Sequence, residues 1–263
     1  PLPGRALGTA PLPTVGEPAE GRPDLYAYDL CPFCTRARMI FGLKSIEHRL
    51  IWLSYDDAAT PTALIGKKMA PILHIKGETP LPESMDIIKR IDSDPAWGPP
   101  VLQPASGRKD LKEFEARHWP VIRRLLHTRF VKVNLPELAS KGGRDYFINQ
   151  HPVEGPAGED RPEASVWKEQ FEFAKKVTWY EHHLEHSEPV IARLSADLAC
   201  LEQLIHSEHS VTSSGVGYDD VIFFCRMRPI TLIKGIRLGP KFAAYLENMS
   251  LKTDIPLLTS MAL

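Results

Sequence analysis

Two cysteines, Cys31 and Cys34, form the pair in this chain best suited to chemistry. They bound the run CPFC between a strand-like segment, 25–30, and a helix-like segment, 32–43. A sulfur at a helix start lies over free N–H groups and the positive end of the helix dipole, so the pKa of Cys31 should fall. Cys34, one turn further along, can close a disulfide with Cys31. The pattern predicts thiol–disulfide exchange, in which Cys31 attacks and Cys34 or an external thiol resolves the mixed disulfide.

A metal site is the alternative use of such a pair. Two cysteines supply half of a zinc tetrahedron, but His48 and His74 are isolated and no second CxxC follows. His182 and His186 stand one helical turn apart, a spacing typical of a solvated helix face as well as of a zinc site. No metal is therefore expected.

A proline after Met69 and Ala70 supplies a second element of a binding site. Pro71 opens a strand-like segment. A cis Ala70–Pro71 bond there could present backbone groups to an extended, peptide-like ligand. An ordinary proline at the start of a strand is the alternative interpretation.

Glu83 and Ser84 supply a third element, because they open a helix-like segment. Free N–H groups, the helix dipole and the Ser84 hydroxyl can hold a carboxylate there, while Glu83 can meet an ammonium group. An α-amino acid moiety would satisfy both. Plain helix capping is the alternative.

The elements that position these residues alternate in type between residues 25 and 92. The order predicted is βαβαββα, with a hairpin around Gly77. Its segments are 25–30, 32–43, 49–53, 61–65, 71–76, 78–81 and 83–91. This order favours an α/β domain built on one sheet.

Composition changes on both sides of that domain. Residues 1–24 are rich in Pro, Gly and Ala and are interpreted as a flexible leader, and 93–109 have the composition of a linker. Residues 110–263 are predicted to form an all-α domain. Its helical segments are 111–131, 144–149, 163–186, 189–205, 219–233 and 241–249. Cys200 and Cys225 fall in apolar stripes and are predicted to be small core residues.

Charge and hydropathy exclude several functional classes. The 263 residues carry 32 Lys and Arg against 33 Asp and Glu, so no field exists to attract nucleic acid. No apolar run is long enough to cross a bilayer, so no membrane partner is expected. Four cysteines are too few for a disulfide scaffold. We expect the protein to be located in the cytoplasm or in another reducing compartment. The composition of residues 1–24 does not exclude targeting to an organelle.

Several runs of this sequence together resemble the glutaredoxin 2 family. They are 26–44, which contains the CPFC run, then 59–62, 69–73, 82–87 and the tail 255–263, so the likeness covers nearly everything after the leader. The resemblance implies a thioredoxin-like N-terminal domain packed on a glutathione-transferase-like helical domain. It also implies glutathione-dependent reduction of disulfides, with glutathione as cosubstrate.

The resemblance also assigns roles to residues. Cys31 would be the nucleophile and Cys34 the resolving thiol. The other residues would contact glutathione: Ala70 and cis-Pro71 at its cysteinyl group, Glu83 and Ser84 at its γ-glutamyl end, Lys68 at its glycyl carboxylate, and Phe33 as an aromatic wall where the family usually has Tyr. Met69 is a further glutathione-binding candidate. Implied partners are disulfide or glutathionylated proteins and, through glutathione, glutathione reductase.

Two other functions keep the same fold. One is a cysteine-type glutathione transferase or dehydroascorbate reductase, which substrate profiling would separate from a glutaredoxin. The other is a non-catalytic binding module with an idle thiol pair, which predicts an ordinary pKa for Cys31.

Overall fold

A four-stranded mixed sheet organises the N-terminal part of the chain in the computed structural model, which describes residues 15–156 and 158–263. Its strands are β1 (Asp24–Ala27), β2 (Arg49–Trp52), β3 (Ile72–His74) and β4 (Leu81–Pro82). The spatial order is β2-β1-β3-β4, with β1 parallel to β2 and β3 antiparallel to both of its neighbours. All four residues of β1 are buried, as expected for a central strand covered on both faces.

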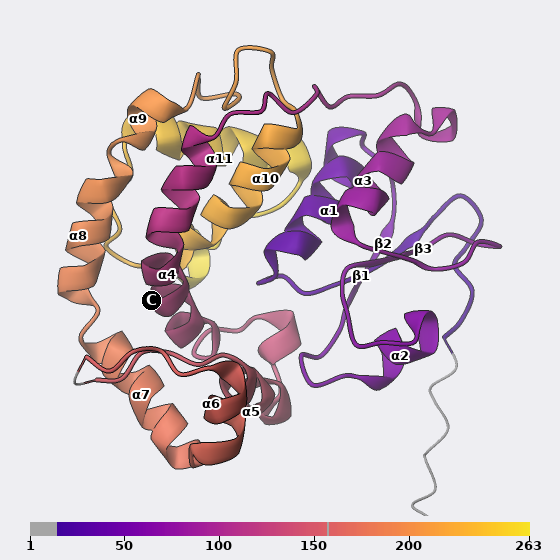
Figure 1. Ribbon diagram of the computed structural model, residues 1–263. Helices are drawn as coiled ribbons and strands as arrows, with labels where there is room; N and C mark the ends of the chain where they lie inside the picture. Colours follow the sequence, from indigo (N-terminus) through magenta and orange to yellow (C-terminus); the bar gives the residue numbers. More distant parts are fainter. Residues whose placement is uncertain (1–14, 157) are drawn as a thin grey trace, which may run out of the picture.

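Helices cover both faces of this sheet. They are α1 (Pro32–Leu43), α2 (Ala59–Ile65) and α3 (Ser84–Ser93). Helices α1 and α3 pack side by side, and α2 lies on the opposite face (Figure 1). The predicted thioredoxin-like βαβαββα order is confirmed. The last strand is shorter than predicted: it begins at Leu81, because the turn around Gly77 occupies the residues before it.

The C-terminal part is helical, as predicted (Figure 1). Its helices are α4 (Asp110–Phe130), α5 (Lys141–Gln150), α6 (Ala164–Gln170), α7 (Phe173–Glu185), α8 (Glu188–Leu198), α9 (Leu201–Leu204), α10 (Tyr218–Met227) and α11 (Pro240–Thr253). Short 3-10 turns are η1 (Pro95–Trp97), η2 (Pro136–Leu138), η3 (Arg228–Leu232) and η4 (Thr259–Met261).

Three predicted helices are in fact each split in two. The segment 163–186 breaks at Phe171, whose extended backbone lets its ring pack against Trp167 and Trp179. The segment 189–205 breaks between α8 and α9, and this break corrects the prediction for Cys200: its thiol is exposed rather than in the core. The segment 219–233 tightens into η3 at Pro229, which has no N–H to continue an α-helix. Cys225 is buried as predicted.

The described part of the predicted leader contacts the sheet domain. Glu17 lies 3.7 Å from the His74 ring, and Ala19 and Arg22 form an isolated bridge. Residues 1–14 lie outside the described residues. Strand β1 begins at Asp24, which the sequence had placed in the leader.

Helix α1 connects the sheet to the helical part. Near its C-terminal end Gly42 meets Thr253 of α11 so closely that a Cβ at Gly42 would lie 1.9 Å from the Thr253 carbonyl oxygen. Near its N-terminal end Arg228, which is 1% exposed, donates to the Asp29 carbonyl oxygen at 3.0 Å and to its Oδ1 at 2.9 Å. Both ends of α1 are thus fixed against the helical part.

Candidate active site

The N-terminus of α1 places Cys31 where the sequence predicts it. Pro32 occupies the first helical turn, and Cys31 is the residue before it, with extended backbone. The N–H groups in the first turn of a helix have no hydrogen-bond partner within the helix. Pro32 therefore starts α1 without the loss of a hydrogen bond. Cys31 is half-buried, whereas Cys34, on the inner side of α1, is fully buried.

The two thiols have pKa values shifted in opposite directions. The Cys34 thiol lowers the pKa of Cys31, and the backbone N–H groups of Cys34 and Phe33 lower it further, against the opposing effect of burial. Burial raises the pKa of Cys34 well above its usual value, and the neighbouring Cys31 adds to the rise. Of the two thiols, Cys31 is therefore the one that ionises first as the pH rises, and Cys34 is the one that keeps its proton.

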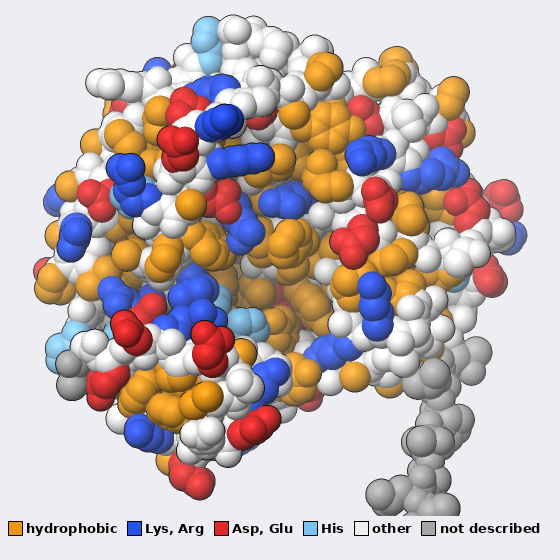
Figure 2. Space-filling view, viewed as in Figure 1, with side chains coloured by type: hydrophobic (Ala, Val, Ile, Leu, Met, Phe, Trp, Pro, Cys, Tyr) orange, Lys and Arg blue, Asp and Glu red, His pale blue; other side chains and the backbone are white. Residues whose placement is uncertain are grey.

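Cys31 opens into a cavity of about 360 Å³ between the sheet domain and the helical domain. Figure 2 shows the molecule hollowed in this region, with apolar side chains along the hollow and basic and His side chains beside it. The residues lining it are Tyr28, Leu30, Cys31, Pro32, Phe33, Tyr55, Met69, Ala70, Trp119, Arg123, Leu126, His127, Phe130, Phe147, His151, Arg226 and Pro229. A disulfide substrate that reaches Cys31 therefore meets an aromatic wall from the helical domain.

Three predicted site residues share this cavity with Cys31: Phe33, Met69 and Ala70. The Ala70–Pro71 bond is cis, which confirms that prediction. Phe33 is 44% exposed, and the guanidinium of Arg36 lies 4.9 Å from the centre of its ring. The ring thus forms an exposed edge of the cavity that contains Cys31.

Lys68, Glu83 and Ser84 do not line the cavity. Lys68 donates to the Tyr55 carbonyl oxygen and lies 3.6 Å from the centre of the Tyr146 ring. Glu83 has a φ of 71°, which is rare for a residue other than glycine, and its side chain does not cap α3. Ser84, the first residue of α3, is buried. The capping interpretation is therefore wrong for the Glu83 side chain.

Sequence reasoning missed Glu137, a fully buried carboxyl of η2 in the helical domain. Its Oε1 accepts a hydrogen bond of 2.7 Å from the N–H of Leu30, the residue before Cys31. Its carbonyl oxygen accepts another, of 2.8 Å, from the N–H of Tyr55. Burial raises the pKa of Glu137 to about 7. The only signal in the sequence is an acid between two leucines, Leu135 and Leu138, outside every predicted helix.

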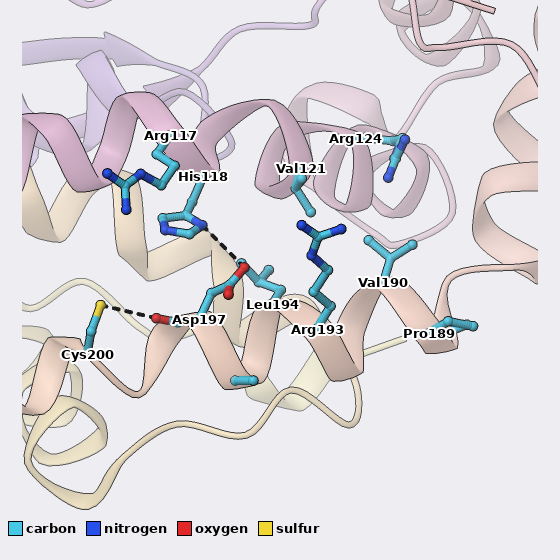
Figure 3. A pocket seen from close by; sticks show the side chains of 11 residues that line it. Arg117, His118, Val121, Arg124, Pro189, Val190, Arg193, Leu194, Asp197 and Cys200 are labelled. Atoms are coloured by element: carbon cyan, nitrogen blue, oxygen red, sulfur yellow. Dashed lines mark hydrogen bonds and ion pairs between the residues drawn. The ribbon is translucent and has the colours of Figure 1, made fainter. Parts of the chain in front are cut away.

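A second, larger cavity, of about 770 Å³, lies between α4 and α8 (Figure 3). Arg117, Arg124 and Arg193 line it, and His118 pairs with Asp197 across it at 3.6 Å. Cys200 stands at its edge. Burial raises the pKa of this thiol, so Cys200 lacks the lowered pKa that is expected of an exchanging thiol.

Comparison with known proteins shows the family to which this chain belongs. Residues 167–262 match the glutaredoxin 2 C-terminal domain, and residues 25–100 match the glutathione S-transferase N-terminal domain. Glutaredoxin 2 of Escherichia coli K12 is 35% identical over 241 residues, which are 91% of this chain and 99% of that protein. The chain belongs to the glutaredoxin 2 family.

Solved structures agree with this assignment. Glutaredoxin 2 of Salmonella typhimurium, crystallised in complex with glutathione, superposes with a TM-score of 0.77 and 35% identity over 93% of this chain and 100% of that one. Glutathione transferase GSTFuA3 of Phanerochaete chrysosporium shares the fold, with a TM-score of 0.53 at 14% identity over 89% of this chain and 98% of that one. As a member of the glutaredoxin 2 family, the chain is an oxidoreductase of the glutathione-dependent class.

The described residues have neither a membrane-spanning helix nor a cluster of metal ligands. None of the helices in residues 15–156 and 158–263 combines the length and apolarity needed to cross a membrane. The same residues contain no group of three or more His, Cys, Asp or Glu side chains placed to hold a metal ion. His182 and His186 stack on one another with ring centres 4.2 Å apart.

Proposed function

We propose that this glutaredoxin 2 family member reduces protein and small-molecule disulfides, and glutathione mixed disulfides, through Cys31 and Cys34. The observation that carries the proposal is the contrast between the two sulfurs. Cys31 is half-buried, opens into the interdomain cavity and has a lowered pKa, whereas Cys34 beside it is buried and has a raised one. An accessible thiolate backed by a protected thiol is the arrangement that disulfide exchange requires.

The reaction begins when the Cys31 thiolate attacks one sulfur of a substrate disulfide. A Cys31–S–S–R bond forms, the substrate S–S bond breaks, and the other substrate sulfur leaves as a thiolate that takes a proton from water. With a glutathionylated substrate the group left on Cys31 is glutathione. A second glutathione thiolate then releases it as glutathione disulfide, which glutathione reductase reduces, or Cys34 expels it and closes the Cys31–Cys34 disulfide.

Glutathione, as cosubstrate, would lie along the cis-proline segment. The backbone of Met69 and Ala70 lines the cavity beside Cys31, so an extended tripeptide attached to that sulfur can pair with it. The Glu83 side chain does not cap α3, so the backbone N–H groups at the start of α3 and the Ser84 hydroxyl would hold the γ-glutamyl carboxylate. Lys68 and the exposed Phe33 ring would flank the glycyl end and the sulfur.

Regeneration by glutathione requires a reducing compartment, either the cytoplasm or the interior of an organelle. In either place the substrates would be proteins that carry a disulfide or a glutathione group. The apolar, aromatic wall of the helical domain would contact the part of the substrate that follows its sulfur.

The test is NADPH consumption with glutathione, glutathione reductase and a small glutathione mixed disulfide. The wild type is expected to turn over and Cys31→Ser to be inactive. If Cys34→Ser still consumes NADPH, the reaction follows the monothiol route. If Cys34→Ser is inactive, the reaction follows the dithiol route. A wild type that consumes no NADPH contradicts the proposed function for this class of substrate. Conjugation and dehydroascorbate assays on the same protein then test the transferase alternative.

A further inference from the structure

A carboxyl group of the helical domain lies buried beside the two thiols of the sheet domain. Glu137 is fully buried, and its Oε1 is occupied by the Leu30 N–H. Its Oε2 is also buried and has no hydrogen-bond partner among the described residues. An unpaired buried carboxyl oxygen is costly, and such exceptions in a folded protein call for an explanation.

Closing the disulfide needs a proton acceptor for Cys34. The Glu137 carboxyl is close enough to Cys31 and Cys34 to raise the pKa of both thiols. Cys34 has no contact with solvent, so its proton has no direct path to bulk water. A thiol must lose this proton to act as a nucleophile.

We propose that Glu137 is the proton acceptor for Cys34 when the Cys31–Cys34 disulfide closes, and the proton donor when it opens. This inference rests on the proposed function. The Cys34 sulfur attacks the Cys31 sulfur of the glutathione mixed disulfide, and its proton passes to the Glu137 carboxylate. The Cys31–glutathione S–S bond breaks, and glutathione leaves as a thiolate. When an incoming thiolate later attacks Cys31, Cys34 leaves and takes the proton back from Glu137.

The surroundings of Glu137 suit both directions of transfer. Burial raises its pKa to about 7, so the acid and the carboxylate are both present near neutrality. The charged and titratable groups that face it are Asp29, Tyr28, Tyr55, Cys31, Cys34 and Arg228. Asp29 raises the pKa of Glu137 and is itself paired with Arg228 and Arg38, while the two tyrosines keep their protons because burial raises their pKa values. Glu137 is therefore the acid in this group that changes charge near neutral pH.

The experiment resolves the two steps of a single turnover. Reduced protein is mixed rapidly with glutathione disulfide, quenched with acid at set times, and weighed by mass spectrometry. The glutathione adduct reports attack by Cys31, and its conversion to the intramolecular disulfide reports attack by Cys34. Glu137→Gln is the main variant, because its amide oxygen can still accept from the Leu30 N–H while the titrating group is gone.

We expect Glu137→Gln to form the adduct within twofold of the wild-type rate. Its closure at pH 7 should be slower by on the order of 10²-fold, the usual contribution of a positioned base. Wild-type closure should level off above pH about 7, where Glu137 is ionised, whereas closure in Glu137→Gln should keep rising about tenfold per pH unit. Glu137→Asp, which restores a carboxyl, should recover a levelled profile.

Two controls separate this role from a structural one. Cys34→Ser should hold the adduct without closure. Asp220→Asn removes another fully buried carboxyl of the helical domain, one that is bonded to Val211, Gly217 and Tyr245 far from the thiols, and it should close at the wild-type rate.

Three results would overturn the proposal. If Glu137→Gln closes the disulfide at the wild-type rate and with the wild-type pH profile, Glu137 does not accept the Cys34 proton. The proposed function is not affected by that result. Equal slowing of adduct formation and closure shows that Glu137 only positions the loop at Leu30. A wild type that forms no adduct on Cys31 contradicts the proposed function as well.

Discussion

Two cavities of this protein each hold a cysteine at the edge, with arginine and histidine side chains around it, and only one of the two thiols has a lowered pKa. Cys31 stands immediately before the first residue of α1. Cys200 stands two residues after the last residue of α8. Cys200 is also the residue before the first residue of α9, which has only four residues. The first sulfur thus lies at the positive end of a twelve-residue helix, whereas the second lies between the C-terminus of α8 and the N-terminus of a four-residue helix, whose dipoles oppose each other there.

The hydrogen bonds of the two cysteine sulfurs also differ. The sulfur of Cys31 faces donors, the Cys34 thiol and two backbone N–H groups, which stabilise its thiolate. The Cys200 thiol instead donates to the Asp197 carbonyl oxygen at 3.1 Å, a contact that only the protonated form can make. A nearby guanidinium, Arg117, does not offset burial at Cys200. The difference in pKa between these two thiols therefore follows the hydrogen bonds to each sulfur more than the arginines around it.

The largest expected effect comes from removing each thiol in turn. Cys31→Ser should lower glutathione-coupled turnover by on the order of 10³-fold or more, because a serine hydroxyl stays protonated and cannot form the mixed disulfide. Cys200→Ser should leave turnover within twofold of the wild type. NADPH consumption measures both variants. A large loss in Cys200→Ser would mean that the second cavity contributes to the reaction.

The next effect concerns the ion pair that holds the loop before Cys31. Arg228→Met removes one of the two buried arginines paired with Asp29 and leaves Arg38, so it should lower the free energy of unfolding by about 1.5 to 3 kcal/mol, the usual contribution of a hydrogen bond to a charged group. Urea unfolding measures this change. The matched control is Arg22→Met, whose pair with Glu47 is exposed on both sides and should be worth at most about 1 kcal/mol. Equal losses in the two variants would contradict the anchoring role.

The opposite end of α1 offers a smaller test. Gly42→Ala places a methyl group against the Thr253 carbonyl of α11, and relieving this overlap should cost about 1 to 3 kcal/mol of stability. Gly16→Ala adds the same group where no heavy atom lies within 4 Å, and it should leave the melting temperature nearly unchanged. Calorimetry measures the melting temperatures of the two variants and of the wild type. An unchanged melting temperature in Gly42→Ala would show that α1 and α11 separate easily.

The rate of alkylation of Cys31 and of Cys200, measured as a function of pH, compares the two thiols directly. The lowered pKa of Cys31 means that its thiolate forms below the pH at which an ordinary thiol ionises, and the raised pKa of Cys200 means the reverse. Each unit between the two pKa values changes the ratio of thiolate fractions at pH 7 about tenfold. Iodoacetamide labelling followed by peptide mass spectrometry measures each rate. Coincident pH profiles would contradict the assignment of Cys31 as the nucleophile.

The sequence by itself determined the elements that depend on local pattern. The run CPFC, with its proline at the first helical turn, predicted the start of α1 and the lowered pKa of Cys31, because those properties depend on neighbours in the chain. Alternating strand and helix patterns predicted the βαβαββα order. The proline after Ala70 predicted a cis bond that the structure contains.

The tertiary structure alone decided which distant residues reach the thiols. Glu137 lies more than a hundred residues after Leu30, and no periodicity in the sequence reports that its carboxyl meets that N–H. The exposure of Cys200 was missed for the same reason: an apolar stripe shows which face of a helix could be buried, but the break between α8 and α9 decides whether it is. Local patterns fix dihedral angles and helix ends, whereas burial and charge proximity depend on how the two domains pack.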